Sequence, residues 1–566
     1  MSNVEIICKN TGIRKEYPMG VTLAQIAADQ QVVLKDDILG AKCNNKLREL
    51  SYEVYKPKTI EFIDINDSIG YAMYLRSMVF ILFKAVRDLW PECTLKVEHA
   101  LPLGSYCEIL GRNGELTLDM VMKLRDRMQQ IVDARLPFVR TVLPTEEAIE
   151  IFKKNRLNEK VLLFQTRREL YTTVYTLDDV SNYFYGYLVP HTGYIKNFHI
   201  DRYFGNGLIA MRPDAGEIIG QDTRKFLSTL IQEALDGGSK LFKTFQEQKD
   251  WLDIMGVPYV GNLNKVVLEE GPGRLIKISE ALQEKKIANI ADMVVKSPDC
   301  RIVLISGPSS SGKTSFCKRL SIQLQVLGYQ TAEISLDDYF VDREKTPLDE
   351  NGEYDFECIE AIDREFFNQQ LDQMLQAKNV EIKLPTYDFR DGKRKFLGKK
   401  VKVSPKTILI IEGIHGLNPA LTTIDPRFTF KIFVSALTHI SIDTQNPVSS
   451  TDNRLIRRMV RDNNFRGNTA LDTLSRWASV RRGENKNIFP YQENADVMFN
   501  SALLFELGVL KKHAEPLLRE IPESSEHYGE ATRLLKFLSY FVSIDEKEIP
   551  PTSILREFLG ESSFIY

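Results

Sequence analysis

Hydrophobic and polar residues form two kinds of pattern in the first part of the chain. Short apolar runs alternate with turn residues over residues 1–64, with one helix-like run, and this predicts a small β-rich domain. Two long amphipathic stretches, at 68–90 and 116–134, predict helices of a separate α+β unit that ends near residue 225. Strand-like segments follow the two helices at 169–177 and 193–200.

The pattern changes after residue 225. Helical segments broken by glycine and proline over 226–290 are typical of a connector. From residue 301, fully apolar strands such as 301–306 and 407–413 alternate with helices, which predicts a parallel sheet covered on both faces. After about residue 500 the chain is mostly helical. These patterns predict five parts, at 1–64, 65–225, 226–290, 291–510 and 511–566.

Composition adds three limits to this picture. The chain has 566 residues, 43% of them hydrophobic and 27% charged, so it resembles a soluble globular protein and not a disordered one. Its formal charge of −3 gives no general attraction to nucleic acid or anionic lipid. The seven cysteines are scattered and form no C-x-x-C pair, the start has no leader pattern, and no run of about eighteen apolar residues occurs. We therefore expect a cytoplasmic protein.

The most informative motif is a glycine-bounded loop between a predicted strand and a predicted helix. Its sequence satisfies G-x-x-x-x-G-K-[ST], in which backbone amides and the helix amino terminus surround phosphate oxygens. We expect Lys313 to neutralise the β and γ phosphates of ATP and Thr314 to offer its hydroxyl to Mg²⁺. The predicted ATP-binding residues of this segment are Gly307, Ser309, Ser310, Ser311, Gly312, Lys313, Thr314 and Ser315. The alternative is a surface turn rich in serine and glycine.

Acidic residues follow two predicted strands of the same sheet. In such sheets ligands lie beyond the carboxyl ends of the strands. A carboxylate near Asp337 or Asp338 can accept the proton of an attacking hydroxyl, and Glu412 can orient Mg²⁺. Either aspartate could instead cap a helix or shape a turn.

Four arginines are spaced at i, i+3, i+4 and i+7, which places Arg454, Arg457, Arg458 and Arg461 on one side of a predicted helix. Like charges repel, and only Asp452 and Asp462 are near in sequence, so we expect a polyanion such as ATP to neutralise the stripe as a lid closes. An ordinary solvated basic face, or a strip that binds RNA, is the alternative.

Over roughly 290–510 the chain resembles the uridine kinase and phosphoribulokinase family of P-loop kinases. The motifs that carry the resemblance are Ser-Leu-Asp-Asp-Tyr-Phe at 335–340, Tyr-Asp-Phe-Glu at 354–357, Tyr-Asp-Phe at 387–389, Glu412 and the arginine helix through Arg466. The resemblance implies that Asp337 is the catalytic base, that Lys313, Arg458 and Arg461 act on the transferred phosphoryl group, and that Arg457 and Arg466 bind ATP. It also implies that Asp355, Tyr387 and Arg394 bind the acceptor.

One departure from the family concerns the acceptor. Uridine kinases follow Tyr-Asp-Phe with a short segment that holds a base-contacting histidine, whereas this chain has Gly392 at that place. Losing one hydrogen bond to a base costs about 1 to 3 kcal/mol, which is enough to change the preferred substrate.

The first half resembles the amino-terminal part of threonyl-tRNA synthetase, with a TGS-like β-grasp domain over 1–64 and an editing-type domain to about 225. The positions that align with the zinc-type ligands of that editing domain are Arg76, Phe80, Phe184 and Leu188, and none of these can serve as such a ligand. The resemblance implies a scaffold without its hydrolytic site, reused to bind RNA or a nucleotide or for regulation. A spacer or homodimerisation module is the alternative.

These observations predict an ATP- and Mg²⁺-dependent kinase that transfers the γ-phosphoryl group to a small-molecule hydroxyl, with the 5′-OH of a nucleoside as first candidate. One rival is a nucleotide-dependent regulator that binds RNA or tRNA, in which the loop acts as a switch. Another is a kinase of a different small hydroxyl compound.

Overall fold

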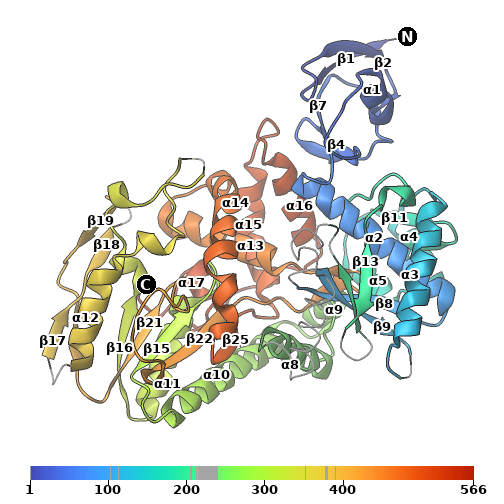
Figure 1. The fold of residues 1–566 in the computed structure, drawn as a ribbon. Coiled ribbons are helices and arrows are strands. Elements are labelled where there is room, and N and C mark those ends of the chain that lie inside the picture. The colour runs from blue at the N-terminus through green and yellow to red at the C-terminus, as the bar shows by residue number, and fades with distance from the viewer. Residues whose placement is uncertain are drawn as a thin grey trace.

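The computed structural model describes residues 2–101, 104–112, 114–203, 207–211, 213, 240–350, 352–376, 380–388 and 391–566 (Figure 1). Three predicted features lie partly outside these residues. They are the end of the α+β unit, 214–225, the first part of the connector, 226–239, and the positions 389 and 390 of the Tyr-Asp-Phe segment and the basic loop after it.

The first residues form a five-stranded sheet with the order β2-β1-β7-β4-β5, set apart from the rest of the protein in Figure 1. Side chains of β1 (Asn3–Cys8) alternate between solvent and core, as the sequence pattern predicts. Helix α1 (Leu23–Asp29) begins at Thr22, whose hydroxyl accepts a hydrogen bond from the amide of Gln25. The other strands are β2 (Arg14–Pro18), β3 (Val21–Thr22), β4 (Gly40–Cys43), β5 (Lys46–Arg48), β6 (Glu53–Val54) and β7 (Lys58–Ile63).

The next unit packs helices against two antiparallel sheets. Helix α2 (Ser68–Leu89) was predicted to be amphipathic, but thirteen of its 22 residues are buried and they occupy all of its sides. Among the described residues it alone is long and apolar enough to cross a membrane, and 72% of that apolar stretch is buried in this protein, as in a core helix. The remaining elements are β8 (Thr94–Leu101), β9 (Gly104–Leu110), α3 (Leu118–Asp133), β10 (Val139–Pro144), α4 (Thr145–Lys154), α5 (Asn158–Thr166), β11 (Tyr171–Leu177), β12 (Val180–Asn182), β13 (His199–Arg202) and β14 (Gly207–Met211).

The predicted parallel sheet is confirmed. Its five strands have the order β16-β21-β15-β22-β25, and every pair is parallel. All five residues of β15 (Ile302–Ser306) are buried, because helices cover both faces of the sheet. The other strands are β16 (Gln330–Ser335), β21 (Thr407–Glu412), β22 (Thr429–Ser435) and β25 (Val497–Asn500). This topology brings three predicted site segments, after β15, β16 and β21, to one edge of the sheet.

Helices and short hairpins surround this sheet. The helices are α8 (Lys240–Ile254), α9 (Val260–Glu269), α10 (Gly273–Lys296), α11 (Lys313–Val326), α12 (Arg364–Gln376), α13 (Ser450–Arg466), α14 (Ala470–Asn487), α15 (Glu506–Arg519), α16 (Tyr528–Leu538) and α17 (Arg556–Leu559). The hairpins pair β17 (Val380–Lys383) with β20 (Lys400–Val403), β18 (Thr386–Asp388) with β19 (Lys393–Lys395), and β23 (Ser441–Asp443) with β24 (Asn446–Pro447).

The hairpin of β23 and β24 joins the two halves of the molecule. The carbonyl of Thr444 accepts a hydrogen bond from the amide of Val97 in β8 (2.7 Å). Where β23 enters the turn of the hairpin, Nζ of Lys160 lies 2.6 Å from Oδ1 of Asp443, and both side chains are completely buried. One hydrophobic core runs from α2 through this junction to α17. The α+β unit and the parallel sheet therefore pack as one body.

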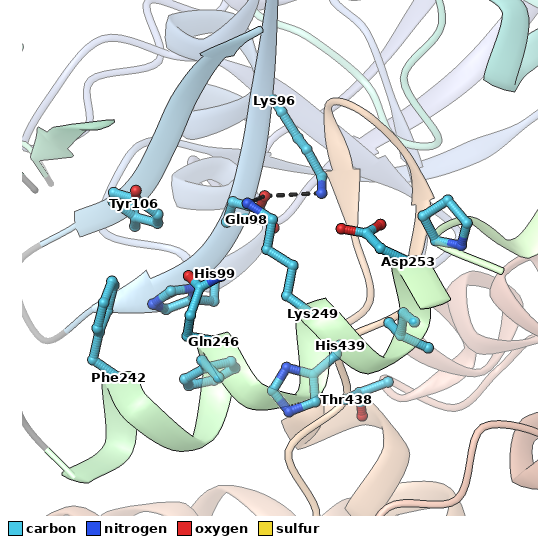
Figure 2. A pocket seen from close by; sticks show the side chains of 13 residues that line it. Lys96, Glu98, His99, Tyr106, Phe242, Gln246, Lys249, Asp253, Thr438 and His439 are labelled. Atoms are coloured by element: carbon cyan, nitrogen blue, oxygen red, sulfur yellow. Dashed lines mark ion pairs between the residues drawn. The ribbon is translucent and has the colours of Figure 1, made fainter. Parts of the chain in front are cut away.

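A small polar cavity lies beside the same junction (Figure 2). Glu98 on β8 pairs with Lys96 (2.8 Å) and with Lys249 of α8 (3.0 Å). The ring of His99 stacks on Phe245 of α8, with 4.1 Å between centroids. Burial lowers the pKa of His99 to about 4, so this imidazole is neutral and forms part of the packing at physiological pH.

Candidate functional site

The loop after β15 has the backbone shape that its glycines allow. A Cβ at Gly307 would lie 1.9 Å from the carbonyl oxygen of Val434, so no side chain fits there. Gly312 has a φ of +81°, which favours glycine, and it stands immediately before α11. Helix α11 begins without a side-chain cap, and the hydroxyls of Ser310 and Ser311 are buried without a hydrogen-bond partner among the described residues. This arrangement suits an oxygen-rich anion at the start of the helix.

Two buried arginines of α13 donate hydrogen bonds to the backbone of this loop. The guanidinium of Arg454 donates to the carbonyl of Ser309 (3.0 Å), and that of Arg457 donates to the carbonyl of Ser310 (3.4 Å). Each arginine also pairs with a glutamate distant in sequence, Arg454 with Glu484 and Arg457 with Glu506 (2.5 Å). The fold therefore gives the arginine stripe two acidic partners in addition to Asp452 and Asp462, which are near it in sequence. Arg457, predicted to bind ATP, is completely buried and contacts the loop backbone.

The other arginines lie towards the carboxyl edge of the sheet. Nη1 of Arg458 donates to Oγ of Ser309 (2.9 Å), and Arg458, Arg461 and Arg466 all pair with Asp462, at 3.3, 2.8 and 3.5 Å. Burial, and then the charge of Arg461, lower the pKa of Arg466 to about 10. Such a cluster of cations favours the binding of an anion at this place.

The two neighbouring aspartates after β16 have different surroundings. Asp338 accepts a hydrogen bond from the amide of Tyr387 (3.3 Å) and pairs with Lys399 (2.8 Å), so it braces a turn. Burial raises the pKa of Asp337, and this effect is opposed by the positive charges of Lys313, Arg466 and Arg461. Asp337 is thus the aspartate that faces the loop lysine.

Two more carboxylates share this environment. Glu412, at the end of β21, accepts a hydrogen bond from the hydroxyl of Ser335 (3.0 Å), and burial together with the charge of Asp337 raises its pKa to about 7. Burial also raises the pKa of Glu357 to about 7, opposed by Arg458 and Lys313. Three carboxylates with raised pKa values near one lysine are typical of a site that binds a cation or moves a proton.

With this geometry in place, the chain can be compared with known proteins. Residues 302–504 match the model of the Phosphoribulokinase / Uridine kinase family. They form a P-loop kinase domain of that family. The kinase domain is similar to the uridine kinase of Macrococcus caseolyticus, with 29% identity over 198 residues, which cover 35% of this chain and 86% of that enzyme.

The amino-terminal region has different relatives. It is distantly similar to the threonine–tRNA ligase of Syntrophomonas wolfei, with 27% identity over 186 residues, which cover 33% of this chain and 29% of the ligase. The chain spans less than a third of the length of the threonine–tRNA ligases it matches. A solved structure described as a possible uridine kinase from Bacillus stearothermophilus matches with a TM-score of 0.26 and 20% identity, over 38% of this chain and 98% of that one.

Asp355, Tyr387 and Arg394 were predicted to bind the acceptor, and the structure gives each of them different contacts. Asp355 accepts a hydrogen bond from the amide of Glu357 (3.0 Å) and so shapes its own turn, whereas Glu357 interacts with the charges of Lys313 and Asp337. Glu357 is the functional candidate that sequence reasoning missed. Arg394 pairs with Asp363 (2.8 Å) and lies over the ring of Phe366.

The remaining acceptor candidate is buried. Tyr387 packs edge-on against Phe340, with 5.6 Å between ring centroids, and its backbone amide is held by Asp338. Nearby, a Cβ at Gly392 would lie 2.8 Å from Cβ of Arg343. The side chain of Arg343 therefore fills the space at the position where the family resemblance implies a histidine.

The carboxy-terminal residues of the chain lie against the phosphate-binding loop, which the sequence did not predict. Oε2 of Glu557 accepts hydrogen bonds from the amide of Ser315 (3.2 Å) and from its hydroxyl (2.7 Å). The hydroxyls of Tyr566 and Ser315 are 2.8 Å apart, and a Cβ at Gly312 would lie 2.5 Å from Cγ2 of Ile554. A carboxylate thus accepts a hydrogen bond from an amide in the first turn of α11, at a position where anions bind.

The raised pKa of Glu357 gives a stability prediction. The folded protein binds the proton of the Glu357 carboxyl more tightly than the unfolded chain does. The contribution of this group to the free energy of unfolding is therefore present at low pH and is lost as the pH rises through about 7. We expect Glu357→Gln to raise the free energy of unfolding at pH 8 by about 1–3 kcal/mol, and this gain to shrink towards pH 4.5. Urea titrations at several pH values measure it. Glu360→Gln changes an exposed carboxylate of the same segment and serves as the control. A gain independent of pH would contradict the assignment.

Proposed function

We propose that the kinase domain transfers the γ-phosphoryl group of ATP to a hydroxyl of a small molecule, with the 5′-OH of a nucleoside as the first candidate. The observation that carries the proposal is the position of Asp337. Its carboxylate lies within the electrostatic reach of Lys313, Arg461 and Arg466, at the edge of the sheet where the phosphate-binding loop ends. A base and a set of cations around one point suit phosphoryl transfer, which depends on positioning and charge neutralisation.

Each residue then has a role in the transfer. The first-turn amides of α11 and Lys313 bind the phosphates, and Arg458, Arg461 and Arg466 stabilise the charge that spreads over the transferred group. Asp337 accepts the proton of the acceptor hydroxyl. Glu357 orients the acceptor by accepting a hydrogen bond from one of its hydroxyls. The loop keeps its shape because Arg454 and Arg457 hold its backbone.

The residues present also suit Mg²⁺. Thr314 offers a hydroxyl and Glu412 a carboxylate, and oxygen is the ligand that this ion prefers. When bound with ATP, Mg²⁺ neutralises charge on the phosphates. The raised pKa of Glu412 fits this role, since a cation at a buried carboxylate favours its ionised form. We further propose a cytoplasmic location, for which the seven free cysteines are the support.

An acceptor screen tests the proposed reaction. The purified chain is incubated with ATP, Mg²⁺ and a panel of nucleosides and other small alcohols, and products are identified by mass. A product heavier than its acceptor by one phosphoryl group, with equimolar ADP, is the expected result. Measurable ATP binding without transfer to any acceptor would count against a kinase and favour the rival in which the loop is a switch.

The contact of Glu557 with the loop leads to a prediction about ATP affinity. A carboxylate at the Ser315 amide repels the phosphates, so Glu557→Gln is expected to lower the Kd for ATP by about three- to tenfold. Calorimetric titration measures it. Glu561→Gln is the matched control, because Glu561 is exposed and pairs with Arg556 (3.4 Å) away from the loop. Unchanged or weaker ATP binding by Glu557→Gln would show that this carboxylate does not compete with phosphate.

A further inference from the structure

A second, larger cavity lies far from the kinase site, between the amino-terminal sheet and the α+β unit. Its volume is about 700 Å³, which is within the range of small-molecule sites. Three stretches of chain line it, at 48–52, 137–140 and 187–190. We call it the interdomain cleft.

Cations gather around the interdomain cleft without acidic partners. The guanidinium of Arg48 lies over the ring of Tyr52 (4.9 Å to the centroid), and that of Arg140 lies over the ring of Tyr187 (5.4 Å). Nε of Arg76 donates to the carbonyl of Tyr187 (3.1 Å). Across the part of the chain that the structure describes, no carboxylate lies within 4 Å of the charged groups of these three arginines.

Helix α16 adds a fourth unpaired cation from the opposite end of the sequence. Lys536 is an exposed residue, and desolvation of its ammonium group by the surrounding protein, followed by the charges of Arg167, Arg140 and Arg76, lowers its pKa to about 8. Helix α16 packs against β5 of the amino-terminal sheet, so its place there is fixed by the fold. A lysine held among three arginines is an unfavourable arrangement unless an anion joins it.

The acidic groups nearby neutralise little of this charge. Glu169 pairs with Arg167 (3.6 Å), and its charge raises the pKa of Lys536. Glu49 lines the cleft, but burial raises its pKa, and it accepts a hydrogen bond from the hydroxyl of Tyr175. The four unpaired cations therefore outnumber the carboxylates that face them.

Aromatic side chains fill the positions beside the cleft at which the resemblance to the editing-type domain implies metal ligands. Phe80 and Phe184, which align with metal ligands of the editing-type domain, pack together with 5.1 Å between ring centroids. Phe138, which stacks on Phe80, also forms part of the cleft wall. The place of a metal is filled by an aromatic core, while the open space beside it is cationic.

We propose that the interdomain cleft binds a phosphate ester of nucleotide size, with its phosphate held by Arg76, Arg140 and Lys536. Guanidinium groups match phosphate oxygens in pairs, and Arg140, fixed over the ring of Tyr187, loses little freedom on binding. Tyr52 and Tyr187 give the walls flat surfaces for the organic part of the ligand. The site is independent of the proposed kinase reaction.

Binding of adenosine monophosphate and of pyrophosphate to the full chain tests this site. Both probes are titrated calorimetrically into the wild type, Arg140→Ala, Lys536→Ala and Lys313→Ala, with Lys123→Ala as a control that removes one exposed positive charge on α3. We expect at least tenfold weaker binding to the cleft in Arg140→Ala and Lys536→Ala and a change of less than twofold in Lys123→Ala, whereas Lys313→Ala should weaken only a separate binding event at the phosphate-binding loop. Loss in Lys313→Ala alone would place the probes in the kinase loop and overturn the proposal.

Chemical modification of Lys536 provides a second test, which does not require a measured affinity. Since Lys536 carries a lowered pKa, it should react with an amine-acetylating reagent at pH 8 faster than exposed lysines such as Lys123, and adenosine monophosphate should protect it. Mass spectrometry of tryptic peptides quantifies both. Failure of saturating probe to protect Lys536 would overturn the proposal. A short single-stranded RNA that binds a hundredfold tighter than the nucleotide would overturn the assignment to a small ligand.

Discussion

Asp337→Asn is expected to lower kcat by a factor on the order of 10² or more while ATP binding is retained. Asparagine has nearly the same shape but cannot accept the proton of the acceptor hydroxyl. The phosphate cradle, built by the loop and α11, does not contain this carboxylate and stays in place. Single-turnover rates and calorimetric ATP affinities separate the two effects.

The adjacent aspartate provides the matched comparison. Asp338 braces Tyr387 and Lys399, so Asp338→Asn should lower kcat by no more than about tenfold, with a change mainly in acceptor KM. Equal losses in both variants would contradict the assignment of Asp337 as the base. Burial raises the pKa of Asp337, so wild-type kcat should fall as the pH is lowered and the base becomes protonated. The residual rate of Asp337→Asn should lack that dependence on the base.

Lys160→Met is expected to destabilise the protein by about 3–5 kcal/mol, the largest stability effect that the structure predicts. Its ammonium group is completely buried, 2.6 Å from Asp443 and 2.8 Å from Oε1 of Gln445. Removing it leaves the charge of Asp443 in the interior with only amides around it. Urea unfolding, followed by the fluorescence of Trp90 in the α+β unit and of Trp477 in the kinase domain, measures the loss.

Two further variants make this test specific. Lys153→Ala breaks an exposed pair with Glu150 in the same unit and should cost less than about 0.5 kcal/mol. The double variant Lys160→Met, Asp443→Leu removes both charges and should recover part of the stability. If the single and the double variant are equally unstable, the loss comes from packing and not from an unpaired charge.

The sequence predicted those parts of the fold and site that short-range pattern determines. Strand β15 and strand β21 are apolar along their length, so the parallel sheet between helices followed directly from them. The loop at 307–314 is defined by residues in contact with each other, and the position of Asp337 after a strand placed it at the carboxyl edge. These features need no knowledge of distant partners.

The parts that were missed depend on residues far apart in the chain. Glu484 and Glu506 pair with the arginine helix from two later helices, and no spacing in α13 indicates them. Glu557 reaches Ser315 across 242 positions. The difference between Asp355 and Glu357 is subtler, since Asp355 accepts a hydrogen bond within a turn while Glu357 lies within reach of the charges of Lys313 and Asp337. Local spacing identifies candidate groups, and tertiary packing decides which of them meet.

The hairpin of β23 and β24 also limits how the chain can be divided for engineering. A fragment cut before β15 to isolate the kinase domain would expose to water Ile442 of β23 and the preceding Ile440, which are buried in the shared core, together with Asp443 deprived of its lysine. Such a fragment would expose an unpaired strand edge and apolar surface, and it would aggregate. Replacing residues 438–448 with a short polar turn is the alteration that a soluble excised domain requires.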